Sequence, residues 1–285
     1  MSKGILVFAR NNNKVDYVKQ AYFLALRIRK YLNLPTSIVT DSVGYLERQF
    51  PDWNEVFDEV INLNKIKRSE NLTTKTYYDG SLSKHSLEFK NDARVLAFDL
   101  SPYDQTLMLD SDIVIQNSSF LNCFATDSNF QIYSECTDIA GHRDYSEFTY
   151  FNDSGIKFYW ATCVYFTKSA ENKVFFDLLK HIQENWLYYN HVYNVNRSTF
   201  RNDYAFSIAI HIMNGHNAGN FAQEMPGKLF YITDRDILQT INENSCLVLV
   251  EKKDNLGEYT PVRIKNLNLH AMNKFSLNRC IGEVL

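Results

Sequence analysis

The sequence predicts an α/β fold in which a central mixed sheet is flanked by helices within a single domain. Three observations support this prediction. The short, continuous apolar run Gly4–Ala9 is typical of a buried strand in a parallel sheet, and the run Thr36–Thr40 (TSIVT) is expected to be the second strand. A helical repeat of apolar residues, Val15–Leu32, separates these two runs. A third apolar run, Thr106–Leu109, ends in a pair of carboxylates, at a position where open α/β sheets commonly bind ligands.

The first strand, the helix and the second strand together make a βαβ unit of ordinary length. Arg10 and Asn11–Asn13 form a polar loop at the carboxyl end of the first strand, and Asn13 is the expected N-cap of the helix. Asp41 directly follows the second strand. The sequence leaves two roles open for Asp41, a contact with a ribose or base and a cap of the next segment.

The next elements lead to the carboxylate pair. Glu59–Leu63 is the expected third strand, residues 64–84 a long polar loop, Leu87–Leu100 a helix, and Gln105–Leu109 the strand before the pair. Residues 64–94 are locally basic, which indicates either a solvated face or a phosphate-facing loop and helix. The cations of this segment are Lys65, Lys67, Arg68, Lys75, Lys84, Lys90 and Arg94.

The second half of the chain is expected to alternate strands and helices around a polar surface loop or lid at Thr137–Gly155. The aromatic stretch Trp186–Tyr193 is interpreted either as packing between helices or as a stacking platform for a sugar or base. The other expected strands are Phe130–Ser134, Tyr159–Thr167, Leu229–Thr233, Cys246–Glu251 and Val262–Leu269, and the expected helical segments are Ser119–Phe124, Ala170–Trp186 and Tyr204–Met213.

Composition limits the classes of function. The net charge of −3 gives no general footprint for nucleic-acid binding. The sequence contains no apolar run long enough for a transmembrane helix, and the N-terminal MSKGILVFAR lacks the core of a signal peptide. The 5 cysteines show no metal-binding spacing, which predicts reduced thiols in a cytoplasmic protein. The 18 Tyr, 20 Phe and frequent Asn are typical of an AT-rich genome, such as that of a phage or its bacterial host.

Asp110 and Asp112 stand at the end of a strand that is expected to be buried. A buried carboxylate is costly unless it is paired or binds a cation, and hard oxygen ligands suit Mg²⁺ or Mn²⁺. His270 ends an extended run, NLNLH, and Lys274 follows four residues later. An imidazole and an ammonium next to such a metal are what a bound diphosphate requires, because they add a ligand and further positive charge.

The run YDQTLMLDSDIVI resembles the DxD segment of GT-A glycosyltransferases and, in detail, that of glycosyltransferase family 8. The following NSSFLNCF resembles the turn after that segment, and Arg94 resembles the Arg of the preceding helix. RNDYAFSIAI resembles the family's region at a helix start, with Asn202 and Asp203 in the matching place. LHAMNK resembles the family's HxxGxxKPW motif, although Lys274 comes two residues early, and Ala-Thr-Cys replaces the family's Asn-Ala-Gly stretch.

The resemblance implies a Rossmann-like GT-A fold and transfer of a hexose or pentose from a nucleotide-diphospho-sugar, usually UDP-linked, with Mn²⁺ or Mg²⁺. It places the donor site in residues 1–117, and the acceptor site and a C-terminal metal-ligand segment in residues 118–285. The implied metal ligands are Asp110, Asp112 and His270. The implied contacts of the donor are Arg94, Asp110, Ser111 and Lys274, with Ala9, Arg10, Asn11 and Asp41 around the nucleoside. The implied catalytic candidates are Asn202 and Asp203. The family retains anomeric configuration, and in an inverting enzyme Asp203 would be the first candidate for the base.

Three alternative hypotheses compete with this one. A HAD-type phosphatase would use Asp110 as nucleophile and Asp112 as acid and base, but that motif normally opens its fold. A sugar-1-phosphate nucleotidyltransferase usually needs a glycine-rich phosphate loop, which FARNNNKV does not provide. A non-catalytic binding module leaves the carboxylate pair without a purpose.

The sequence leaves the acceptor and the oligomeric state open. A glycan, a small molecule and a hydroxymethylated base of viral DNA are all compatible with it. A base would have to be flipped out of the duplex before transfer.

Overall fold

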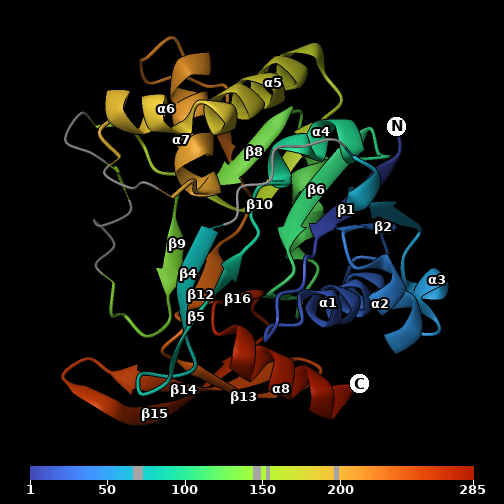
Figure 1. Cartoon of the computed structure of the whole chain (residues 1–285), viewed down its shortest axis with the longest axis vertical. Helices are drawn as coiled ribbons and strands as arrows, with labels where there is room; N and C mark the ends of the chain where they lie inside the picture. Colours follow the sequence, from blue (N-terminus) through green and yellow to red (C-terminus); the bar gives the residue numbers. More distant parts are fainter. Residues whose placement is uncertain (67–72, 144–148, 152–154, 196–198) are drawn as a thin grey trace.

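The computed structural model describes residues 1–66, 73–143, 149–151, 155–195 and 199–285, in which strands and helices alternate (Figure 1). The strands are β1 (Lys3–Phe8), β2 (Thr36–Thr40), β3 (Glu59–Asn62), β4 (Thr73–Tyr78), β5 (Lys84–Phe89), β6 (Gln105–Asp110), β7 (Ile113–Val114), β8 (Phe130–Tyr133), β9 (Cys136–Asp138), β10 (Trp160–Thr167), β11 (Gln223–Glu224), β12 (Leu229–Ile232), β13 (Ile237–Ile241), β14 (Ser245–Lys252), β15 (Asn255–Lys265) and β16 (Leu269–Ala271). The α-helices are α1 (Tyr17–Tyr31), α2 (Val43–Gln49), α3 (Trp53–Val56), α4 (Ala97–Leu100), α5 (Ala170–Glu184), α6 (Trp186–Val192), α7 (Asn202–Met213) and α8 (Lys274–Val284), and 3₁₀ turns lie at Leu63–Lys65, Arg94–Leu96 and Ser119–Ala125.

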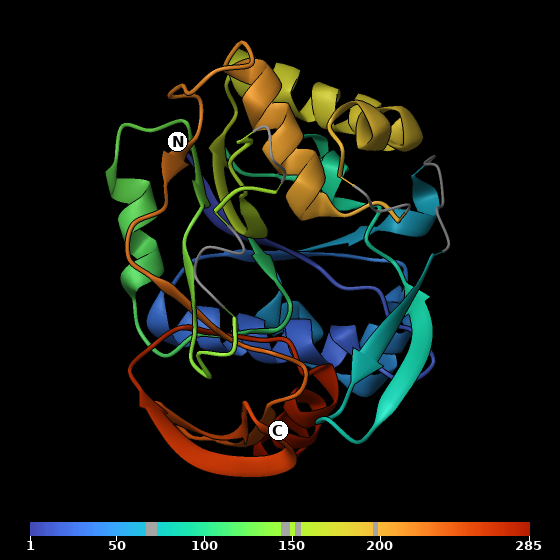
Figure 2. The ribbon, with the colours of Figure 1, turned by 90° about the vertical axis from the view of Figure 1, so that its left-hand side faces the viewer.

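A seven-stranded sheet forms the centre of the molecule, with the strand order β11-β8-β10-β6-β1-β2-β3. The strands β6, β1, β2 and β3 are parallel to one another, whereas β10 is antiparallel to both β6 and β8. Helices cover both faces of this sheet (Figure 2). The predicted α/β fold with a central mixed sheet flanked by helices is therefore confirmed.

Both faces of the central strands are buried, which explains why their sequences are apolar without alternation. Ile5 and Val7 of β1 pack with Leu24 of α1 in one core cluster. Leu6, which points to the opposite face, packs with Phe175 of α5 in a second cluster. A layer of helices on each side holds the sheet rigid, so the side chains at the ends of its strands are well positioned.

A second, four-stranded sheet has the order β7-β16-β12-β9. Its strand β7 directly follows the Asp110-Ser111-Asp112 turn, and β16 pairs with it in an antiparallel register that sets His270 opposite Ile113. The backbone N–H of Ala271 also donates to the carbonyl oxygen of Asp112 over 3.0 Å. This pairing brings the C-terminal part of the chain to the carboxylates at the end of β6.

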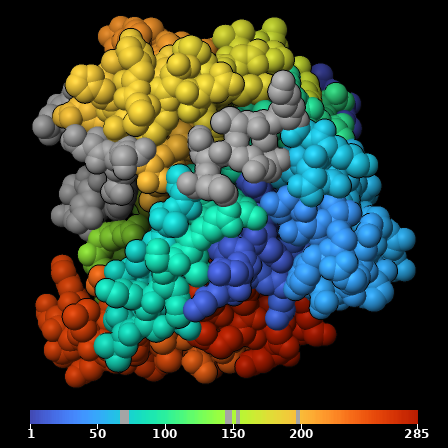
Figure 3. All heavy atoms as spheres, viewed as in Figure 1, coloured from blue at the N-terminus to red at the C-terminus, as the bar shows by residue number. Residues whose placement is uncertain are grey.

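The segment between β3 and β6 differs from its prediction. The expected loop at 64–84 and the expected helix at Leu87–Leu100 are wrong, because β4 and β5 form an antiparallel hairpin and helical turns begin only at Arg94. Tyr77 of β4 and Leu87 of β5 are buried, and they form a small cluster with Val15. In the space-filling view the hairpin, in teal, lies between the loop before α1, in blue, and the C-terminal segment, in red (Figure 3).

The remaining corrections concern helix ends and the C-terminal segment. The first helix begins at Tyr17 with Asp16 as its N-cap, rather than after Asn13, because the carboxylate of Asp16 accepts the backbone N–H of Lys19. The helices α2, α3 and α8 and the strands β7, β9, β11 and β13 were not predicted. All 5 cysteines are free, and among the described residues no helix is long and apolar enough to cross a membrane.

Candidate active site

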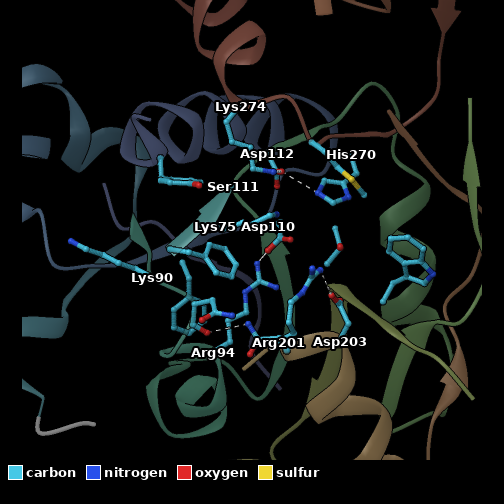
Figure 4. Close-up of a pocket in the computed structure, with 18 of the residues that line it drawn as sticks. Lys75, Lys90, Arg94, Asp110, Ser111, Asp112, Arg201, Asp203, His270 and Lys274 are labelled. Atoms are coloured by element: carbon cyan, nitrogen blue, oxygen red, sulfur yellow. Dashed lines mark hydrogen bonds and ion pairs between the residues drawn. The ribbon is translucent and has the colours of Figure 1, made fainter. Parts of the chain in front are cut away.

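A cavity of about 340 Å³ opens at the carboxyl ends of β1 and β6 (Figure 4). Residues of β1 and β6 form its base, residues of the β4–β5 hairpin one wall, and residues of β10, α7 and the β16–α8 connection the others. Parallel strands present their carboxyl ends at one edge of a sheet, which is why segments far apart in sequence meet here.

Asp110, Asp112 and His270 form a compact group inside this cavity. One potential ligand atom from each of the three lies within 4.8 Å of the others. Nε2 of His270 is 3.0 Å from Oδ2 of Asp112, and both residues are nearly inaccessible to solvent, with exposed fractions of 6% and 3%. Figure 4 shows the three side chains around a common space, with Lys274 next to Asp112.

This group fits a divalent cation. Two carboxylates supply the hard oxygen ligands that Mg²⁺ and Mn²⁺ prefer, and imidazole is a further ligand that Mn²⁺ accepts. Nδ1 of His270 is buried and has no hydrogen-bond partner among the described residues, so part of the hydrogen-bonding capacity of the ring is unused. Asp110, Asp112 and His270 are therefore the residues that would hold the ion.

Two cations of the chain itself compensate the carboxylates. Lys274 forms an ion pair with Asp112, and Arg94 forms one with Asp110. Burial opposes ionisation of Asp112, but the neighbouring His270 and Lys274 outweigh it and hold the pKa of this carboxyl well below its ordinary value. Asp112 is therefore a carboxylate at any physiological pH.

Arg94 is held in place by its second contact. Nη1 of Arg94 donates to the carbonyl oxygen of Ala161 in β10 over 2.8 Å. Burial lowers the pKa of this guanidinium, against the attraction of Asp203 and Asp112. The side chain thus presents a fixed, desolvated positive charge to the cavity, which strengthens its interaction with any anion.

The whole cavity is positively charged, in contrast to the net charge of −3 of the chain. Cationic side chains outnumber carboxylates in its lining, which favours an anionic ligand. The cations are Arg10, Lys75, Lys90, Arg94, Arg143, Arg201 and Lys274, and the carboxylates are Asp110, Asp112, Asp203 and Asp234.

The structure brings most of the predicted donor-site residues together. Arg10 and Ser111 line the cavity with the metal-ligand group, whereas Ala9, Asn11 and Asp41 do not. Ala9 is buried in the hydrophobic core. The side-chain amide of Asn11 donates to the carboxylate of Asp16 and accepts from the backbone N–H of Val18.

Asp41 reaches the cavity only through its partners. Its Oδ2 accepts from Nε of Arg10 over 3.0 Å and from Nζ of Lys90 over 3.4 Å. It does not cap α2, whose first turn has no side-chain cap. Asp41 therefore holds two cavity cations in place, and a nucleoside contact of its own remains a prediction.

Asp203 and Asn202 lie at the start of α7 and both line the cavity. Oδ1 of Asp203 accepts the backbone N–H of Ala161 over 3.0 Å, and Oδ2 accepts from Arg201 over 3.1 Å. Nδ2 of Asn202 donates to the carbonyl oxygen of Asn91, while its Oδ1 is buried without a partner among the described residues. Asp203 and Asn202 thus belong to the cavity lining beside the metal-ligand group.

Several cavity residues were not placed in the site by sequence reasoning. Lys75 and Lys90 were noted only as part of a basic segment, and Arg143, Trp160 and Arg201 were not considered. The signal for Lys75 was the alternation of TTKTYY, which is typical of a half-buried strand, as β4 proves to be. Lys67 and Arg68 lie outside the described residues, as does part of the expected lid at 137–155.

The aromatic stretch 186–193 does not reach this cavity. Trp186 and Tyr189 are buried against the helical layer, whereas Leu187 and Tyr188 are exposed on the outside of α6. Among the described residues of the cavity lining none comes from α6. Helix packing, rather than a stacking platform at the site, is the role of this stretch.

Comparisons with known proteins leave the activity of this chain open. No protein-family profile and no curated protein matches the sequence. Similar solved structures include the glycosyltransferase GlyE of Streptococcus pneumoniae TIGR4 (11% identity, TM-score 0.42, 79% of this chain and 45% of that chain) and the galactosyltransferase LgtC in complex with donor and acceptor sugar analogs (12%, 0.44, 78% and 72%). The bifunctional IspDF of Campylobacter jejuni is another (12%, 0.39, 80% and 50%). This chain thus spans less than half the length of GlyE, and its activity has to be inferred from the side chains of the cavity.

Proposed function

We propose that the protein is a metal-dependent glycosyltransferase, which moves a sugar from a nucleotide-diphospho-sugar to an acceptor hydroxyl. The observation that carries this proposal is the group of Asp110, Asp112 and His270 within 4.8 Å of one another, in a cavity rich in cations. Carboxylates alone repel a diphosphate, and a divalent cation joins the two. When bound, Mn²⁺ or Mg²⁺ would neutralise the charge that develops on the departing diphosphate.

The chain's own cations add to this effect. In the reaction, the bond between the anomeric carbon and the phosphate oxygen breaks, and negative charge collects on the leaving diphosphate. Lys274 and Arg94 form ion pairs with Asp112 and Asp110, the two carboxylates that would hold the ion. Both cations are therefore positioned to contact the diphosphate that the ion would bind. Fixed positive charges aimed at a developing negative charge lower the barrier without reorganisation.

Asp203 and Asn202 are the proposed contacts of the reacting sugar or the acceptor. The acceptor oxygen forms a bond to the anomeric carbon and passes its proton to an oxygen of the departing diphosphate. Both oxygens of Asp203 already accept hydrogen bonds, from Ala161 and from Arg201, which favours an orienting role for this carboxylate over that of a base. The buried Oδ1 of Asn202 offers an acceptor for a sugar hydroxyl.

The phosphatase hypothesis is not favoured. It requires Asp112 to donate a proton to a leaving group at neutral pH. His270 and Lys274 hold the pKa of Asp112 well below its ordinary value, so this carboxyl carries no proton to give. Asp110, the nucleophile of that scheme, is also occupied by Arg94.

Calorimetric titration with UDP, with and without Mn²⁺, tests the proposed donor site. We expect binding that depends on the metal and is lost in Asp110→Ala and in Asp112→Ala. Asp177→Ala, which removes an exposed carboxylate on α5, is the matched control and should bind as the wild type does. Hydrolysis of p-nitrophenyl phosphate without any affinity for UDP would contradict the proposal.

The acceptor is tested separately, by following consumption of UDP-sugars with simple sugars, oligosaccharides and hydroxymethylated DNA. Transfer to DNA should fall steeply with salt, since phosphate contacts release counterions. Transfer to a neutral glycan should change little. The comparison therefore distinguishes the two acceptor classes.

A further inference from the structure

In the part of the chain that the structure describes, the ammonium of Lys75 lacks the carboxylate partner that five other cations of the cavity have. Arg10, Lys90, Arg94, Arg201 and Lys274 each form an ion pair with a carboxylate. Among the described residues no carboxylate lies within 4.0 Å of the ammonium of Lys75. A partly buried ammonium without a carboxylate is unfavourable in the empty cavity, and an anionic ligand would remove this penalty.

The β4–β5 hairpin holds this ammonium inside the cavity. Lys75 lies between two exposed threonines of β4, and strand alternation turns its side chain inward with that of Tyr77. Its Nζ is 5.4 Å from the ring centre of Tyr77 and 5.3 Å from that of Phe89. The hydroxyl of Tyr17, at the start of α1, donates to that of Tyr77 over 3.0 Å, which fixes this wall.

The surroundings of Lys75 are dominated by like charge. Burial and the neighbouring Lys274 and Arg201 lower the pKa of Lys75 to about 8, against the weaker attraction of Asp234 and Asp112. Lys274 is the cation on the metal-ligand carboxylate. Lys75 is thus close enough to Lys274, the cation beside the proposed phosphate site, for the charge of Lys274 to lower its pKa.

We propose that Lys75 binds an anionic oxygen of the donor diphosphate, from the wall of the cavity that the β4–β5 hairpin forms. This inference rests on the proposed function and extends it, because it assigns the β4–β5 hairpin to the donor site. A lysine ammonium offers three donors and a charge, and a charge-assisted hydrogen bond to phosphate is among the stronger polar contacts in proteins.

Lys75→Met is the test variant, because methionine keeps the length of the side chain and packs well against Tyr77 and Phe89. Lys84→Met, which removes an exposed ammonium from the same hairpin, is the matched control. We expect Lys75→Met to weaken binding of UDP with Mn²⁺ about tenfold or more, and Lys84→Met to bind as the wild type does. Lys75→Arg should restore most of the lost affinity.

Two further measurements distinguish phosphate binding from a purely structural role. Binding of uridine, which has no phosphate, should be equal in Lys75→Met and the wild type. The Tm of unliganded Lys75→Met should equal or exceed that of the wild type, because the variant removes a crowded charge. A lower Tm together with equal losses for UDP and uridine would show that Lys75 only supports the hairpin.

The outcomes separate this inference from the proposed function. Metal-dependent UDP binding that is unchanged in Lys75→Met overturns the role of Lys75 and leaves the glycosyltransferase standing. If the wild type fails to bind UDP, pyrophosphate with Mg²⁺ replaces it as the probe. Pyrophosphate binding that is lost in Lys75→Met then supports the anion site while the UDP donor is rejected, and no binding of either probe rejects both.

Discussion

The ion pair between Lys274 and Asp112 leads to a prediction about stability that a metal ion should reverse. In Lys274→Met the side chain keeps its length but loses its charge, so the buried carboxylate of Asp112 retains only His270 as a partner. The exposed fractions of the two paired side chains are 14% and 4%, which makes this a buried pair. Removing one partner of such a pair costs about 3–5 kcal/mol.

The lower end of that range applies here, because Nε2 of His270 stays 3.0 Å from the carboxylate. For a chain of this length a loss of ~3 kcal/mol corresponds to a fall in Tm of about 6 °C. The pKa of Asp112 is depressed in the folded protein, so its contribution to stability is present above the unfolded pKa and is lost as the pH falls through the folded one. The variant's deficit should therefore be full at neutral pH and shrink only as the pH falls below about 3.9, the ordinary pKa of an Asp carboxyl.

A divalent cation should replace the missing charge. Mn²⁺ at a hundred times its dissociation constant adds about 2.7 kcal/mol, which nearly cancels the loss. Thermal unfolding of the wild type, Lys274→Met and the double variant Asp112→Asn/Lys274→Met, each with and without Mn²⁺, measures this. The double variant should recover stability without metal and gain little from it. Equal Tm values for wild type and Lys274→Met, or a Mn²⁺ effect that survives Asp112→Asn, would refute the reasoning.

Three further predictions address the core, the pH dependence and the chemistry. Gly4→Ala should lower the free energy of unfolding, measured by urea titration, by about 1–3 kcal/mol, because the new methyl group would collide with the buried, hydrogen-bonded ring of Tyr103. The control Gly44→Ala, in an open part of α2, should be neutral or slightly stabilising. UDP affinity should fall as the pH rises from 7 to 9, since the pKa of Lys75 is about 8 and its charge is lost above that value; in Lys75→Met the calorimetric affinity should not show this fall. Asp203→Asn should keep UDP affinity within about twofold and reduce sugar transfer at least tenfold, because an orienting group acts mainly in the transition state; unchanged transfer would exclude that role.

The strands that the sequence revealed are those buried on both faces. In such strands no charged residue interrupts the buried stretch, and the pattern needs no partner to be recognised, as in Gly4–Ala9, Thr36–Thr40 and Thr106–Leu109. The sequence pattern did not predict the hairpin 73–89, because its buried face is small and its outer residues are polar. Tyr77 and Leu87 find their packing partners only when Val15 is brought beside them by the fold.

Sequence reasoning found those candidate-site residues that form an uncommon pattern, and it missed those that look like ordinary surface residues. Two carboxylates at the end of a strand, and a histidine and a lysine four residues apart, are rare enough to notice in the sequence. Their meeting in one cavity supports that analysis. Lys75 and Arg201, in contrast, look like any surface cations until strand alternation and the start of α7 turn them inward.

The contacts that complete the metal-ligand group have a consequence for folding kinetics. Asp112 meets His270 and Lys274 across separations of 158 and 162 residues. Contacts of such long range form late, since the entropy of closing the intervening chain has to be overcome first. The sheet can assemble from β1, β2 and β6 while the carboxylate at its edge still lacks both partners. Acquisition of tight Mn²⁺ binding during refolding should therefore coincide with the last docking step, and it would report the completed fold more faithfully than any signal from secondary structure.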